Sequence, residues 1–260
     1  MKPLNEIRCF LVDMDGTFYL GDRLLPGALE FAELMRSRGV PFLFLTNNSS
    51  KKNSQYAEKL RRLGLEIDAS QIFTSGEATA IYLKREKPGA RLYVVGTPAL
   101  ESELDAHGFT RTEENPDYVV LGFDTTVTYD KLWKLCDFVR AGVPYIATHP
   151  DLNCPTENGF MPDTGAFIRL VEASTGRLPD VVIGKPNAPI VAAVSDKVGL
   201  PIEDMAMIGD RLYTDIALGK TGITTILVLS GETKQEDLVD SPFQADYVMR
   251  DLADLVEHMR

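Results

Sequence analysis

The sequence predicts an α/β fold with a mainly parallel sheet that helices cover on both faces. Short apolar runs recur along the chain, and runs of this length are typical of buried strands. Stretches with apolar residues every three or four positions lie between many of these runs and predict amphipathic helices. The alternation of the two patterns is typical of βαβ units, in which successive strands run parallel. Such sheets bind ligands beyond the carboxyl ends of their strands, so the residues after each strand are the candidates for function.

The expected elements follow one another along the whole chain. The strands are RCFLV at 8–12, PFLFL at 41–45, RLYVV at 91–95, YVVL at 118–121, PYIA at 144–147, VVI at 181–183, MAMI at 205–208 and TTILVL at 224–229. The clearest helices are 28–38, 55–63 and 188–198, in which the apolar positions fall on one side. Trp133 falls on the apolar side of a further helical stretch, 131–140, and is expected in the core.

The composition limits the partners. The chain has 260 residues and a formal net charge of −11, which disfavours nucleic acid, because binding to nucleic acid depends on Lys and Arg at the phosphates. No apolar run approaches the roughly 20 residues that a membrane span needs. The three cysteines leave one unpaired in any disulfide scheme, which favours a reducing compartment and a cytoplasmic protein. A small ligand is the expected partner, and a homodimer is left open.

Two carboxylates follow the first expected strand. The segment 13–17 (DMDGT) comes directly after this strand, so Asp13 and Asp15 stand where a buried strand opens into a turn. Gly16 suits a turn that needs positive φ or a close backbone approach, and N–H groups at Gly16 and Thr17 can hold phosphate oxygens. A plain turn is the alternative, because Asp and Gly are common turn residues.

Hydroxyl, amide and ammonium groups follow two further strands. Thr46 and Asn47 open a run of five polar residues after 41–45, although such clusters are also common in plain loops. Lys185 follows 181–183 in a chain short of positive charge. A phosphate site in so acidic a protein needs local positive charge, which this lysine supplies. The alternative for a lone lysine is a solvated surface position.

Two more carboxylates follow the strand 205–208. Asp210 comes after Gly209, and Asp215 follows five residues later. Carboxylates placed in this way suit a hard cation such as Mg²⁺, with water in its remaining positions. Four strand ends therefore carry complementary chemistry, which a set of unrelated surface turns does not explain.

In this order the four segments resemble the four motifs of the haloacid dehalogenase superfamily of aspartate-nucleophile phosphatases. Roughly 140 residues separate the second and third motifs, which is similar to the branch of NagD-like and p-nitrophenyl phosphatases, where a large cap is inserted. The resemblance covers nearly the whole chain. It implies a Rossmann-like core with a parallel sheet, formed by residues 1–79 and 179–260, and an inserted α/β cap, residues 80–178.

The resemblance also implies a role for each matching residue. Asp13 is the nucleophile, and Asp15 is the general acid and then the base that activates water. The phosphoryl oxygens are bound by Gly16, Thr17, Thr46, Asn47 and Lys185. Mg²⁺ is held by Asp13, the backbone carbonyl of Asp15, and Asp210, with Asp215 as a direct or outer-shell partner. The implied activity is hydrolysis of small phosphate monoesters, such as sugar phosphates or nucleoside monophosphates, through an aspartyl phosphate on Asp13.

A loop in the implied cap is the candidate for substrate specificity. The segment 148–165 is rich in Pro, Asn, Asp and Gly and is expected to be a turn-rich loop. Relatives in this branch tend to carry Asn and Gly where this chain has His149 and Asp163, so the resemblance alone does not define the substrate preference. Asp151 and Asn153 complete the candidate set, and a plain connector is the alternative.

Other functions compete with hydrolysis. A mutase uses the same aspartyl phosphate but passes the phosphoryl group to a second substrate, and the large cap without a second acceptor motif favours hydrolysis instead. A sugar- or nucleotide-sensing module and a protein-interaction scaffold leave the charged set unexplained, because close carboxylates cost stability unless a ligand offsets their repulsion.

Overall fold

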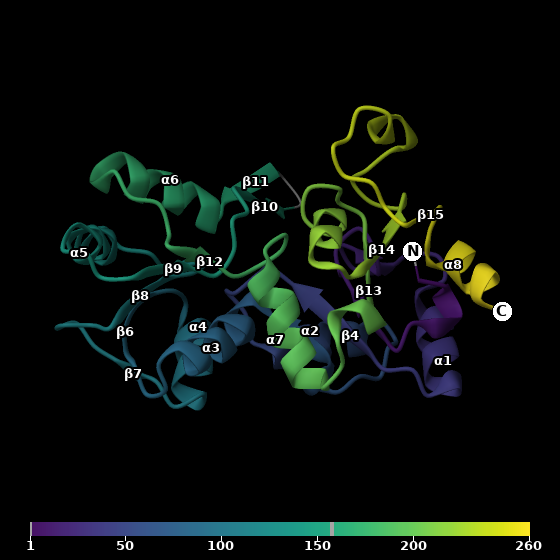
Figure 1. The fold of residues 1–260 in the computed structure, drawn as a ribbon, viewed down its shortest axis with the longest axis horizontal. Helices are drawn as coiled ribbons and strands as arrows, with labels where there is room; N and C mark the ends of the chain where they lie inside the picture. Colours follow the sequence, from purple (N-terminus) through teal and green to yellow (C-terminus); the bar gives the residue numbers. More distant parts are fainter. Residues whose placement is uncertain (1, 157–158) are drawn as a thin grey trace. The chain divides into compact units, whose positions relative to one another are not determined.

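The structure is a computed structural model that describes residues 2–156 and 159–260 (Figure 1). Its contacts divide the chain into two compact units. The first unit comprises Met1–Thr46, Asn53–Phe73 and Val194–Arg260, and the second comprises Asn47–Lys52 and Thr74–Ala193. The domain limits expected from the sequence, with residues 80–178 inserted, stay a prediction.

A six-stranded sheet runs through the first unit in the order β15-β14-β13-β1-β4-β5. Its strands are β1 (Cys9–Val12), β4 (Phe42–Thr46), β5 (Ile72–Thr74), β13 (Met205–Gly209), β14 (Thr224–Val228) and β15 (Tyr247–Met249). Neighbouring strands from β15 to β4 pair in parallel. Their carboxyl ends therefore meet at one edge of the sheet, which is where the sequence places its candidate residues.

Three helices cover one face of this sheet: α1 (Ala28–Arg38), α2 (Asn53–Arg62) and α8 (Leu252–Met259). Alternate strand residues such as Phe10 and Phe44 pack against them because side chains on a strand point to opposite faces in turn. Figure 1 shows α1 beside α8, and a methyl group at Gly27, where α1 begins, would lie 2.0 Å from the backbone nitrogen of Ala253. Only glycine allows these two helices to approach so closely.

Short elements connect the sheet and the helices of the first unit. Strands β2 (Tyr19–Leu20) and β3 (Arg23–Leu24) form a hairpin after the segment 13–17. The 3₁₀ helices are η1 (Leu4–Glu6), η2 (Ala69–Gln71), η3 (Ile202–Asp204), η4 (Ile216–Thr221) and η5 (Gln235–Leu238).

The second unit has a five-stranded parallel sheet in the order β12-β9-β8-β6-β7. The strands are β6 (Arg91–Val95), β7 (Thr110–Arg111), β8 (Tyr118–Leu121), β9 (Tyr145–Ala147) and β12 (Val181–Val182). Helices α5 (Tyr129–Arg140) and α6 (Thr164–Thr175) share a core cluster with alternate residues of the sheet. Figure 1 draws α3 (Ser75–Glu86) and α4 (Pro98–Ala106) on the other side of this sheet.

The residues of α7 (Ala188–Val198) are divided between the units: those up to Ala193 belong to the second unit, and those from Val194 belong to the first. Two parallel sheets with helices confirm the predicted α/β class. The helices expected at 28–38 and 188–198 have the bounds that the periodicity predicts. None of the helices in the described residues is long and apolar enough to cross a membrane.

Two expectations are corrected. The segment 148–165 is not only turns, because it contains the hairpin of β10 (Asn153–Thr156) and β11 (Gly159–Pro162), whose proline and glycine residues hide a strand signal. Trp133 is 62% exposed rather than in the core. It lies one residue, or about 100° around the helix, from Leu132, which belongs to the side that packs on the sheet.

Candidate active site

Three carboxylates meet at the carboxyl edge of the first unit's sheet. Strands β1 and β13 are neighbours in register, and the backbone N–H of Asp13 donates to the carbonyl of Ile208 at 2.9 Å. Asp13 follows β1, and Asp210 follows β13, so the pairing brings them together. Carboxylate oxygens of Asp13, Asp210 and Asp215 all lie within 4.8 Å of one another. Carboxylates this close repel one another, and a hard cation with oxygen ligands fits them.

Backbone donors fix two of these carboxylates. The N–H of Glu232 donates to Asp210 Oδ2 at 2.7 Å, and the N–H of Arg211 donates to Asp215 Oδ2 at 3.1 Å. A methyl group at Gly209 would lie 2.3 Å from Asp215 Cγ, so the backbone also packs closely against this side chain. Asp210 and Asp215 are buried. Their oxygens are therefore held in place before any cation arrives.

The turn after β1 requires glycine. Gly16 has φ +90°, and its N–H donates to the carbonyl of Tyr19 at 2.9 Å while its own carbonyl accepts from Ser230 Oγ at 2.9 Å. Thr17 is fully buried, and its hydroxyl lies 3.4 Å from Asp210 Oδ1. The predicted turn thus exists and touches the carboxylate cluster.

Asp15 is exposed at this turn, and its partner is a residue that the sequence analysis missed. The hydroxyl of Tyr19 donates to the Asp15 side chain, and the Lys59 ammonium lies 3.9 Å from the centre of the Tyr19 ring. Burial, and then the negative charge of Asp15, raise the pKa of the Tyr19 hydroxyl well above its ordinary value. Tyr19 therefore stays a hydrogen-bond donor to Asp15 over the physiological pH range. Tyr19 lies only four residues beyond Asp15, but no sequence pattern indicates Lys59.

Arg211 is a second residue that the sequence analysis left without a role. Burial lowers the pKa of its guanidinium, but the charges of Asp13 and Asp210 oppose this effect and leave the pKa above its ordinary value. Its Nε lies 3.0 Å from Glu232 Oε2, although this N–H has no hydrogen-bond partner among the described residues. A permanent positive charge therefore stands next to the carboxylate cluster.

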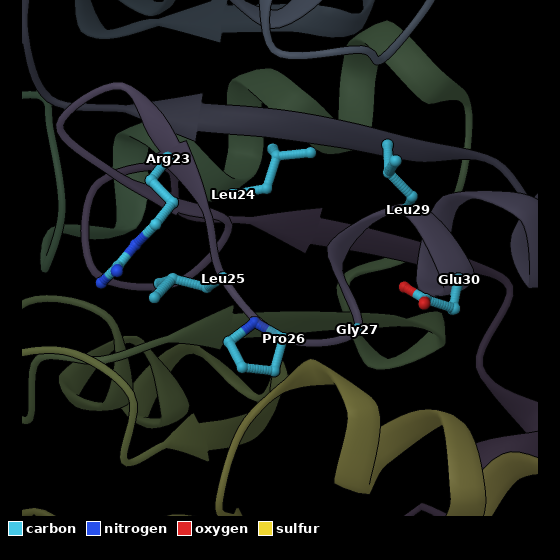
Figure 2. A pocket seen from close by; sticks show the side chains of 7 residues that line it. All are labelled: Arg23, Leu24, Leu25, Pro26, Gly27, Leu29 and Glu30. Carbon is cyan, nitrogen blue, oxygen red and sulfur yellow. The ribbon is translucent and has the colours of Figure 1, made fainter.

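The first unit also has a pocket that the candidate residues do not line. A pocket of about 540 Å³ is lined by residues from Arg23 to Glu30 (Figure 2). Its wall is mostly leucine, proline and glycine, and Arg23 and Glu30 do not converge on one point. It contains none of the predicted site residues, so its size alone does not indicate a function.

Thr46 and Asn47 stand at the end of β4. Thr46 is the last residue of β4, which neighbours β1 in the first unit's sheet. In the second unit, the side-chain carbonyl of Asn47 accepts from the Lys185 N–H at 2.8 Å, and its amide donates to the Lys185 carbonyl at 2.9 Å. The same amide lies 3.2 Å from both Asp151 oxygens. The Asn47 side chain thus joins the backbone of Lys185 to Asp151.

The second unit also brings together most of the predicted loop residues. His149 Nε2 lies 2.8 Å from Asp163 Oδ1, and oxygen or nitrogen atoms of His149, Asp151 and Asp163 lie within 4.8 Å of one another. Asn153 is exposed on β10, where it pairs with Pro162. Lys185 is only 3% exposed, which is unusual for a lysine outside a site.

Comparisons with known proteins extend over the whole chain. A family model described as haloacid dehalogenase-like hydrolase matches residues 10–110, and a second HAD-hydrolase-like model matches 182–255. The chain is 36% identical over 258 residues to an acid sugar phosphatase of Staphylococcus aureus (strain MRSA252), covering 98% of this chain and 99% of the relative. It is 38% identical over 251 residues to an acid sugar phosphatase of Staphylococcus haemolyticus, covering 96% and 95%.

Solved structures agree with these relatives. A 4-nitrophenylphosphatase from Thermotoga maritima superposes with a TM-score of 0.94 at 49% identity, covering 98% of each chain. NagD from E. coli K-12 superposes with a TM-score of 0.89 at 35% identity, covering 95% of this chain and 98% of that one. The similarity is therefore to whole phosphatases rather than to a shared fragment.

Proposed function

Because this chain belongs to the haloacid dehalogenase-like hydrolases and is a phosphatase of their NagD-like type, we propose that it hydrolyses small phosphate monoesters through a phosphoryl group carried on Asp13. The observation that carries the proposal is the carboxylate cluster of Asp13, Asp210 and Asp215 at the carboxyl edge of the sheet. Asp13 is the member next to the exposed Asp15, so a nucleophile and a proton donor stand two residues apart.

The reaction has two displacements. In the first, an oxygen of Asp13 forms a bond to phosphorus and the ester P–O bond breaks, while Asp15 gives its proton to the leaving oxygen. In the second, Asp15 takes a proton from water, the water oxygen attacks phosphorus, and the bond to Asp13 breaks. Inorganic phosphate leaves, and both aspartates return to their starting states. An aspartate needs no base before it attacks, because it is ordinarily ionised at neutral pH.

The cofactor of the proposal is Mg²⁺. Asp13, Asp210 and Asp215, with the backbone carbonyl of Asp15, are the groups that would hold it, and their proximity and oxygen chemistry support this choice. When bound, the ion would supply positive charge that offsets the repulsion between Asp13 and the phosphate. Arg211, beside the same carboxylates, adds to this positive field.

The phosphoryl oxygens have their own proposed ligands. These are Thr17, Thr46, Asn47 and Lys185, whereas Gly16, whose N–H already donates to the Tyr19 carbonyl, is proposed to shape the turn beside them. The Asn47 side chain already forms hydrogen bonds with both the N–H and the carbonyl of Lys185. We therefore assign Asn47 two roles: its side chain positions Lys185, and its own backbone N–H binds the phosphate.

Sugar phosphates are the proposed substrate class, because the relatives are named acid sugar phosphatases. Nucleoside monophosphates and similar metabolites belong to the same proposal. Residues 80–178 are proposed as a cap that reads the leaving group, through the loop that carries His149, Asp151, Asn153 and Asp163. The cytoplasmic location and the homodimer stay predictions.

The experiment is phosphate release by the purified protein. With Mg²⁺ present, p-nitrophenyl phosphate should be hydrolysed, EDTA should stop the reaction, and added Mg²⁺ should restore it. A panel of phosphorylated metabolites then ranks the substrates by kcat/KM. Full activity in EDTA would exclude the metal assignment, and transfer of phosphate to a sugar rather than to water would indicate a mutase.

A further inference from the structure

A buried histidine and aspartate join the two ends of the loop 150–162. His149 is the second residue after β9, and Asp163 is the residue before α6. His149 is fully buried and Asp163 is 3% exposed, and their side chains are 2.8 Å apart. A hydrogen bond between buried groups is strong and costly to break, because neither group can turn to water instead.

Polar contacts around His149 involve both nitrogens of its ring. The N–H of Phe123 donates to Ser49 Oγ at 3.0 Å, Ser49 Oγ lies 3.1 Å from Thr148 Oγ1, and Thr148 Oγ1 lies 2.9 Å from His149 Nδ1. On the other side of the ring, Nε2 lies 2.8 Å from Asp163 Oδ1. Partners at both nitrogens hold the ring in one orientation.

Backbone contacts hold the same two ends. The N–H of Asp163 donates to the Leu152 carbonyl at 3.0 Å, and the N–H of Gly165 donates to the Asp151 carbonyl at 2.8 Å. A methyl group at Gly165 would lie 2.2 Å from the Pro150 carbonyl oxygen, so the first turn of α6 packs on the start of the loop. The position of Asp151 therefore depends on where α6 begins, and the pair of His149 and Asp163 fixes that point.

Asp151 in turn contacts Asn47, which holds the Lys185 backbone. Gly184 lies in the middle of this arrangement, since a methyl group there would lie 2.6 Å from Asn47 Oδ1 and 2.7 Å from His149 Cβ. Two proposed phosphate-binding residues are thus connected to the loop through one short series of contacts, all within the second unit.

From these contacts we infer that His149 and Asp163 form a brace that positions Asp151 against Asn47 and thereby sets substrate affinity and discrimination. This inference rests on the proposed function. The two residues are positioning residues, because they act through Asp151 and do not touch the reacting atoms. A metal ion is a weaker explanation of the cluster of His149, Asp151 and Asp163, because His149 and Asp163 contact each other directly at 2.8 Å and Asp151 contacts the amide of Asn47.

The test compares three variants with the wild type. His149→Leu removes the bond to Asp163, and His149→Gln keeps an N–H donor near the position of Nε2. The matched control is His107→Leu. It removes another contact between a histidine and a carboxylate in the same unit, since His107, the residue after α4, lies 3.3 Å from Glu103. We expect His149→Leu to raise KM for the best sugar phosphate about tenfold and to lower kcat for that substrate by less than this factor. The ratio of kcat/KM between the two best substrates should fall by a similar factor.

His149→Gln should recover most of this loss, and His107→Leu should behave like the wild type. An equal loss of kcat for every substrate, no change in KM, or a loss that His149→Gln does not reduce would overturn the inference.

Hydrogen–deuterium exchange is a second measurement, and it does not depend on phosphatase activity. The amides of Asp163 and Gly165 should exchange faster in His149→Leu than in the wild type and His107→Leu. Unchanged exchange would show that there is no brace, whatever the kinetics. If exchange is faster but the protein hydrolyses no phosphate monoester, the brace is supported and the proposed function is rejected. Failure of the brace and failure of the proposed function can therefore be told apart.

Discussion

Gly16 lies directly against the carboxylate of Asp210, so that a methyl group at Gly16 would come within 2.3 Å of Asp210 Oδ2. The two residues are 194 positions apart in the sequence. Parallel pairing of β1 with β13 brings them together. The turn after β1 is therefore shaped by the neighbouring strand end as much as by its own sequence.

Gly16→Ala should damage the carboxylate cluster. The added methyl group displaces Asp210, and φ +90° is unfavourable for alanine, so we expect a loss of stability of about 1–3 kcal/mol and a large fall in Mg²⁺-dependent turnover. The control is Gly21→Ala, because Gly21 also has positive φ, +58°, but nothing lies within 4 Å of the added methyl group. Urea unfolding and phosphate release measure the two effects. Equal activity of both variants would contradict the role of the close contact.

Asp13→Asn should fold like the wild type and lose turnover by at least about a thousandfold, because an amide is a poor nucleophile. It is also a weaker ligand for a hard cation. The control is Asp22→Asn, an exposed aspartate in the turn between β2 and β3. Phosphate release measures turnover, and circular dichroism checks the fold. Retained turnover in Asp13→Asn would assign the nucleophile to another residue.

Lys131→Met should destabilise the second unit by about 3 kcal/mol, since it leaves the carboxylate of Asp124 buried without its cation. Asp124 is 1% exposed, and Lys131 Nζ lies 2.7 Å from its Oδ2. Lys134 on the same helix pairs with Glu113, which is 80% exposed, at 2.9 Å. Lys134→Met should therefore cost less than about 1 kcal/mol. Similar midpoints of urea unfolding for the two variants would refute the distinction.

The thiol of Cys9 should resist alkylation in the native protein. Burial raises its pKa to about 12, so the reactive thiolate is scarce at pH values where an unfolded cysteine ionises readily. Because the pKa is raised on folding, the full stability is present below the ordinary cysteine pKa and falls as the pH rises towards 12. Peptide mapping after labelling near pH 8 should find Cys154, which is half-buried, modified before Cys9. Equal labelling of Cys9 in native and urea-unfolded protein would contradict its burial.

Local patterns predicted much of the fold. Strands such as β6 and β8, and helices such as α1 and α7, have the bounds that apolar runs and helical periodicity indicate. The hairpin of β10 and β11 was missed because its strands are short and contain proline and glycine. Trp133 was misplaced because periodicity shows that a helix has a buried side but defines its limits only to about one residue.

By itself, the sequence determined the order of strands and helices and the kind of chemical group that follows each strand, because both depend on residues adjacent in the chain. It placed Asp13 and Asp210 at strand ends, with Asp215 five residues beyond Asp210, and predicted a shared edge. Only the tertiary structure decided which groups face one another. Such contacts, as between the Asn47 side chain and the Lys185 backbone or between His149 and Asp163, depend on strand order, register and close backbone packing. A periodic pattern indicates that a residue is buried but not what lies opposite it.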